Sequence, residues 1–281
     1  MIYEICKNKL KEIADAIRYV EDFGQGSINS NNFIDRIRSL KTLLNIRDRY
    51  YIDVIEKKCK GEINNIPNNI TNIRPYAFYN CTNLALTSLP EGIMSIGNYA
   101  FYNCTNLALT SLPEGIISIG DHAFHSCTNL ALTSLPEGIT SINDSTFEWC
   151  KNLALTSLPA GITSIEDGAF DYCTNLALVS LPEGITSIGM RAFQYCKSLQ
   201  TLNLPLAPSI NMSGFYGCTN LTSVTLGSRG HPVVYGRVIA SAFGDCTNLT
   251  SMTIYTKGGS SLYAAPWGAS NATITYIDSN L

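Results

Sequence analysis

The sequence predicts an α/β solenoid, in which the chain winds into about eight right-handed coils of 23 residues with a parallel strand sheet. Cysteines recur 23 residues apart between Cys81 and Cys196, and the same slot returns at Cys218 and Cys246. A phenylalanine stands three residues before every one of these eight cysteines. A fixed period of this length, with the same residue types in the same slots, is typical of a solenoid.

One unit, Cys81–Asn103, shows how a coil is built. Its apolar residues follow neither the 3.6-residue period of a helix nor the two-residue period of a strand. We expect a short strand over 85–89, a Pro-Glu-Gly corner, a second extended stretch over 93–96 and a turn over 98–101. Because a single coil leaves two faces open to water, its apolar residues become buried only when coils stack.

The two ends of the chain differ from the repeat. Residues 1–60 contain two stretches with helical spacing of apolar residues, separated by the glycines at Gly24 and Gly26. We predict a small helical N-terminal cap over 1–60, the solenoid over 61–256 and a C-terminal capping segment over 257–281. Bulky Trp267 is expected to close the C-terminal end, since an open solenoid edge needs a cover.

Leucine spacing differs between the two halves of the solenoid. The later coils read L-x-x-L-x-L, as in Leu199, Leu202 and Leu204, which places the last two leucines on one face of a strand. In five earlier coils the middle leucine stands one place nearer the cysteine, so strict alternation turns it outward. The resulting exposed stripe and the serine column beside it are the predicted ligand-binding residues: Leu86, Leu109, Leu132, Leu155, Leu178, Ser88, Ser111, Ser134, Ser157 and Ser180.

The alternative is a local bulge that turns each leucine inward and leaves the following threonine outside. The two arrangements differ in what they tolerate. An exposed stripe accepts aspartate at Leu132 and Leu155 without loss of the fold, and ligand binding is lost. The sequence alone leaves both arrangements open.

The segments "CTNLTSVTLG" (Cys218–Gly227) and "SIGNYAFYNC" (Ser95–Cys104) resemble the BspA-like, Treponema-type leucine-rich repeat. The resemblance implies a surface or secreted protein that binds a protein or glycan. Lys7–Leu40 and Ala264–Asp278 resemble short segments of tail-associated proteins of phages and prophages. This second resemblance implies an alternative, a structural spacer or assembly component whose helical head mediates assembly.

The cysteines and histidines suggest metal or disulfide chemistry, but their positions favour a structural role. Eight cysteines share one slot of successive coils without any C-x-x-C pair, so we predict a column of small buried side chains. Cys6 and Cys59 stay unassigned. His122 and His125 occupy slots that hold Tyr99 and Tyr102 one coil earlier, and we interpret them as variable surface positions. No metal and no cofactor are predicted.

Charge, hydropathy and the absence of known motifs argue against several other functions. The net charge is −3, and no clustered basic face is present to track phosphates, so no nucleic-acid partner is predicted. No apolar run approaches the roughly 18 residues of a membrane span, and the charged start "MIYEICKNKLKE" is not expected to be a secretory signal. No nucleophile elbow, phosphate loop or paired-carboxylate motif points to an enzyme. The predicted partner is a protein or glycan, and the sequence does not define localisation or oligomeric state.

Overall fold

The computed structural model describes residues 66, 68–178, 180–204, 208–233, 238, 241–257 and 267–280. The chain divides into two units, Met1–Glu56 and Lys57–Leu281, and all of these residues belong to the second. The helical cap predicted over 1–60, together with Cys6 and Cys59, lies outside the described residues.

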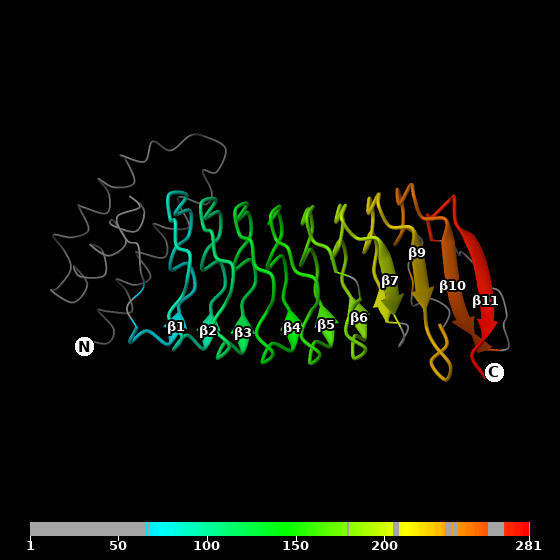
Figure 1. The fold of residues 1–281 in the computed structure, drawn as a ribbon, viewed down its shortest axis with the longest axis horizontal. Coiled ribbons are helices and arrows are strands. Elements are labelled where there is room, and N and C mark those ends of the chain that lie inside the picture. Colours follow the sequence, from blue (N-terminus) through cyan, green and yellow to red (C-terminus); the bar gives the residue numbers. More distant parts are fainter. Residues whose placement is uncertain are drawn as a thin grey trace, which may run out of the picture. The chain divides into compact units, whose positions relative to one another are not determined.

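The predicted parallel solenoid is confirmed: successive coils stack side by side along the unit (Figure 1). One face carries two-residue strands in two parallel sheets, of order β1-β2-β3 and β4-β5-β6-β8. Within each sheet, neighbouring strands pair a serine or asparagine and an isoleucine with the same slot of the adjacent coil, such as Ser95 with Ser118. The isoleucine points into the core. The bounds are β1 (Asn72–Ile73), β2 (Ser95–Ile96), β3 (Ser118–Ile119), β4 (Ser141–Ile142), β5 (Ser164–Ile165), β6 (Ser187–Ile188) and β8 (Ser209–Ile210).

Among the described residues, longer strands form in the C-terminal coils. They are β7 (Thr201–Leu204), β9 (Ser223–Leu226), β10 (Ser251–Thr256) and β11 (Thr273–Asp278), in a parallel sheet of order β11-β10-β9-β7. In β7, buried and exposed residues alternate, as the L-x-x-L-x-L pattern predicts. The strand expected over 85–89 in the earlier coils is absent, because the residues there do not alternate in and out.

A tight turn closes each coil and ties it to the next. In the coil from Cys81, the backbone N–H groups of Tyr99, Phe101 and Asn103 donate to carbonyls of the following coil at 2.7–2.8 Å. Tyr99 and Asn103 have φ of 56° and 55°, a left-handed conformation that non-glycine residues rarely adopt. The same two slots are left-handed in most coils, so the inter-coil hydrogen bonds offset the backbone strain throughout.

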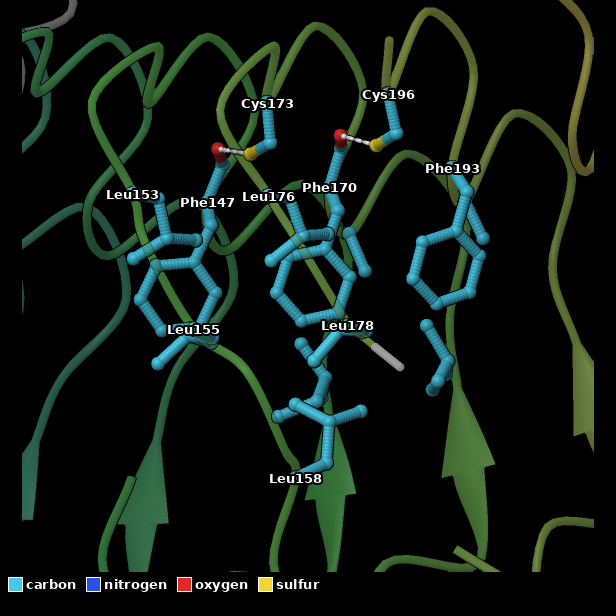
Figure 2. Close-up of a cluster of buried hydrophobic side chains, with 14 of the residues drawn as sticks. Phe147, Leu153, Leu155, Leu158, Phe170, Cys173, Leu176, Leu178, Phe193 and Cys196 are labelled. Carbon is cyan, nitrogen blue, oxygen red and sulfur yellow. Dashed lines mark hydrogen bonds between the residues drawn. The ribbon is translucent and has the colours of Figure 1, made fainter. Parts of the chain in front are cut away.

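Phenylalanines and cysteines form two buried columns along the solenoid. Neighbouring phenylalanine rings lie nearly parallel, with centroids between 4.9 and 5.6 Å apart. The predicted cysteine column is confirmed: all eight side chains are buried. Cys173 donates its thiol hydrogen to the carbonyl of Phe147 at 3.0 Å, and Cys196 bonds Phe170 in the same way at 3.1 Å (Figure 2). These thiols hold adjacent coils together, and burial raises the pKa of Cys150 far above its ordinary range.

Candidate functional site

The leucines predicted to form an exposed stripe are buried, so that prediction is wrong. Figure 2 shows Leu155 and Leu178 beneath the stacked phenylalanine rings, inside the coil. None of the five side chains exposes more than 4% of its surface: Leu86, Leu109, Leu132, Leu155 and Leu178. The bulge alternative describes the structure.

A leucine such as Leu86 points inward because the two residues after it both face outward, which interrupts the strict alternation of a strand. In the coil from Cys81, Leu84 and Leu86 point inward, then Thr87 and Ser88 both face solvent before Leu89 returns to the core. Burying a leucine contributes about 2 kcal/mol more than leaving it exposed, and the threonine hydroxyl stays in water. That gain outweighs the regular strand, because these coils still pair through the short strands on the other face.

The outward side of the earlier coils therefore carries hydroxyl groups. We call it the hydroxyl face, and it consists of Thr87, Thr110, Thr133, Thr156, Ser88, Ser111, Ser134, Ser157 and Ser180. All nine residues are exposed. None of them is charged; four successive coils repeat the same Thr-Ser pair, and the fifth contributes Ser180. The ligand-binding role of the five serines stays a prediction.

The turn edge carries stacked aromatic side chains that the sequence analysis did not anticipate. Tyr99 stacks on His122 with ring centroids 4.6 Å apart, and Tyr102 stacks on His125 at the same distance. In the two coils that follow the histidines, Trp149 stacks on Tyr172 at 4.0 Å. Because the rings lie face to face between coils, they present their edges to solvent and stabilise the turns.

A hollow of about 220 Å³ lies beside these columns. Its lining is rich in ionisable side chains from four successive coils, including His122, Asp144, Glu148, Asp171 and Arg191. Acidic groups outnumber basic ones among those five, so the hollow favours a positively charged occupant.

Asp171 is the most perturbed carboxyl of this hollow. It is 5% exposed, and its Oδ1 atom has no hydrogen-bond partner. Loss of hydration raises the pKa of Asp171 to about 7, the negative charge of Glu148 adds to the rise and Arg191 opposes it. Burial also acts to raise the pKa of Glu148, but interactions with His125 and Ser145 outweigh burial and keep that pKa below its ordinary value.

His122, His125 and Glu148 come together although they lie on two different coils. One nitrogen or oxygen atom of each lies within 4.8 Å of the others, and His125 Nδ1 is 3.4 Å from Glu148 Oε2. Comparing the histidines with their counterparts in other coils missed this cluster. Glu148 is 23 residues after His125, so the period alone indicated that the two side chains stack.

Comparisons with known proteins identify the repeat. The model of a family described as "BspA type Leucine rich repeat region" matches residues 56–177 and 140–258, with six copies. Within the described ranges, no helix is long and apolar enough to span a membrane. No curated protein matches the chain.

Solved structures of bacterial leucine-rich repeat proteins resemble the solenoid. A protein from Bacteroides ovatus is 24% identical, with a TM-score of 0.57 over 79% of this chain and 63% of its own. This chain therefore spans less than two thirds of that protein, and the likeness shows the fold. A leucine-rich repeat protein from T. pallidum is 26% identical over 64% of this chain and 79% of its own, with a TM-score of 0.45.

Proposed function

Because the chain belongs to the BspA-type leucine-rich repeat family, we propose that it is a non-enzymatic recognition protein of the surface or adhesion type. Its hydroxyl face would bind a ligand made of repeating units, for which a glycan chain is the best match. The observation that supports this proposal is the repetition of one exposed Thr-Ser pair in four successive coils, with a serine at the same place in a fifth.

Repetition argues for a repetitive ligand. An irregular protein surface is best matched by side chains that differ from coil to coil, whereas here the outward pair stays the same at Thr87-Ser88, Thr110-Ser111 and Thr133-Ser134. Hydroxyl groups both donate and accept hydrogen bonds, as sugar hydroxyls do. Each bond contributes only about 1 kcal/mol, so useful affinity requires several coils to act together along one ligand.

The buried leucines support this face from below. Leu109 and Leu132 are fully buried, and the backbone that follows them carries the exposed hydroxyls. The backbone N–H of Ala131 donates to the carbonyl of Leu109 at 3.0 Å, which links the same segment of adjacent coils. A rigid base of this kind lowers the entropy lost on binding.

The test places charge on the face and measures binding to a panel of polysaccharides. Ser111→Lys with Ser134→Lys should weaken binding at least tenfold, because two long charged side chains cover the hydroxyl rows of neighbouring coils. Thr140→Lys with Thr163→Lys is the matched control, since both threonines are exposed and lie outside the hydroxyl face. The control should bind like the native protein.

Two outcomes contradict the proposal. Unchanged affinity in the serine pair excludes the hydroxyl face. Binding that survives enzymatic removal of glycans from the target but is lost on its proteolysis replaces the glycan with a protein ligand.

A further inference from the structure

We propose that His122, His125 and Glu148 form a binding site for a divalent metal ion, with Zn²⁺ as the best match. Each residue offers one ligand atom, and all three atoms lie within 4.8 Å of one another. Two imidazole nitrogens and one carboxylate oxygen form a donor set that suits zinc, leaving a fourth position for water or another ligand. The site goes beyond recognition through the hydroxyl face and is independent of it.

The distances require only a small contraction. Zinc ligands at about 2.0–2.2 Å in a tetrahedral arrangement stand roughly 3.3 Å from one another. His125 Nδ1 and Glu148 Oε2 are already 3.4 Å apart. The remaining separations among the three ligand atoms are no more than 4.8 Å.

The state of the two Nδ1 atoms is a second observation that points to a ligand. Both atoms are buried; that of His122 has no hydrogen-bond partner, and that of His125 faces Glu148 Oε2 at 3.4 Å. A buried polar atom without a partner costs about 1–3 kcal/mol. A metal ion that accepts these lone pairs removes that cost, whereas the variable-surface interpretation of the two histidines gives no reason for burying the atoms.

Stacking holds the two imidazole rings in place before any ion binds. His122 lies on Tyr99 with an interplanar angle of 15°, and His125 lies on Tyr102 with an angle of 3°. Both histidines belong to one turn, and Glu148 reaches them from the equivalent turn of the next coil. Fixed rings lower the entropy cost of coordination, as neighbouring groups do in other metal sites.

The electrostatic surroundings favour a cation. Asp144 lines the adjoining hollow and adds negative charge. Arg191 is the opposing cation of the same lining.

The repeat supplies substitutions that remove the site and keep the turn. The two histidine slots hold Tyr99 and Tyr102 in the preceding coil, where the same left-handed turn forms. We therefore expect the double variant His122→Tyr, His125→Tyr to fold. Glu148→Gln is the second variant. Glu91→Gln and His231→Ala are controls, because both residues are exposed and lie outside the three-residue cluster.

The experiment titrates the full chain with Zn²⁺ by calorimetry and with Co²⁺ by visible absorption. The native protein should bind one more equivalent of Zn²⁺ than the double variant. Glu148→Gln should lower the affinity for this additional Zn²⁺ at least tenfold. Both controls should match the native protein. The cobalt spectrum of this equivalent should lack thiolate charge-transfer bands, which separates it from any site at Cys6 or Cys59.

The proposal is overturned if the native protein and the double variant bind Zn²⁺ with the same stoichiometry and affinity. It is also overturned if the cobalt spectrum shows only thiolate-ligated Co²⁺. If the double variant fails to fold, Glu148→Gln decides the question, because the exchange of a carboxylate for an amide keeps the side chain's shape. Unchanged Zn²⁺ affinity in Glu148→Gln then counts against the site.

Discussion

At the scale of single residues, position in the repeat decides between a buried and an exposed side chain more strongly than residue type does. Leu132 and Thr133 are neighbours, yet Leu132 is fully buried and Thr133 faces solvent. Asp171 shows the same effect for a polar residue, since its slot places a carboxyl in a largely buried position. Each of these placements has an energetic consequence that can be measured.

Leu132→Ala should lower the free energy of unfolding by about 2–5 kcal/mol, because it removes a fully buried side chain and leaves a cavity among the stacked coils. Thr133→Ala, one residue later, should change the free energy of unfolding by less than about 0.5 kcal/mol. Urea denaturation followed by circular dichroism measures both. Equal effects at the two positions would contradict the inward placement of the leucine.

Asp171→Asn should stabilise the protein at high pH and have little effect at low pH. The pKa of Asp171 is about 7 in the folded protein and about 3.8 in an unfolded chain. Well below pH 3.8 the carboxyl is protonated in both states, so it contributes no pH-dependent penalty. Between pH 4 and pH 7 the carboxyl is ionised in the unfolded chain but mostly protonated in the folded protein, so the fold loses stability as the pH rises. The loss reaches up to about 4 kcal/mol above pH 7.

Denaturation of the native protein and Asp171→Asn at pH 4 and pH 8 tests this prediction. The difference in unfolding free energy between the two proteins should grow with pH. A difference that is the same at both pH values means that Asp171 ionises normally. Glu166→Gln is a suitable control for the loss of one negative charge in the same coil.

At the scale of elements, the solenoid combines two ways of building a coil. In the earlier coils the inward leucines are the third and fifth residues after the cysteine, and the short strands lie on the opposite side. In the later coils the inward residues are the third and sixth, and β7, β9 and β10 form. The change from one arrangement to the other falls between Leu178 and β7.

Leu178→Thr should therefore destabilise the protein less than Leu132→Thr does. The residue after Leu178 is Val179, which is apolar and stands at the sixth position, whereas the residue after Leu132 is Thr133. Val179 can take the inward place in a coil that already borders the later arrangement. We expect the two costs to differ by about 1–2 kcal/mol, as measured by urea denaturation.

The double variant Leu178→Thr, Val179→Thr provides the control. With no apolar residue left to turn inward, its cost should rise to that of Leu132→Thr. If Leu178→Thr is as costly as Leu132→Thr from the start, the boundary between the two coil types is sharper than proposed.

At the scale of the described solenoid, each coil contacts mainly the coils before and after it. Strand pairs and phenylalanine stacks join equivalent slots of adjacent coils, usually 23 residues apart in sequence, and the cysteine thiols bond phenylalanine carbonyls of the preceding coil, as Cys104 bonds Phe78. Stability in such a protein is approximately a sum over coils and their interfaces. The number of coils should therefore be adjustable, while the length of each coil should not.

Deletion of residues 81–103 removes one full period and joins Asn80 to Cys104, so it should leave a cooperatively folded protein. Its urea m-value should fall roughly in proportion to the residues removed. Deletion of residues 81–92, half a period, should prevent folding of the adjoining coils, because it breaks the phenylalanine and cysteine columns. Circular dichroism and the cooperativity of urea unfolding distinguish the two; equal tolerance of both deletions would contradict the fixed period.

The sequence by itself determined the solenoid, its 23-residue period and the buried phenylalanine and cysteine columns. A fixed period requires equivalent residues to stack, so the inward slots follow once apolar residues recur in them. It also determined the L-x-x-L-x-L strands around Leu202 and Val224, because their residues alternate without interruption.

Only the tertiary structure decided where Leu86 and its four counterparts point. Alternation predicts a direction only inside a regular strand, and here packing against the phenylalanine column outweighs the strand. The structure also showed that His122, His125 and Glu148 converge, because the distance between neighbouring columns depends on how adjacent turns stack. Period reveals which residues stack; packing sets which way they face and how closely they meet.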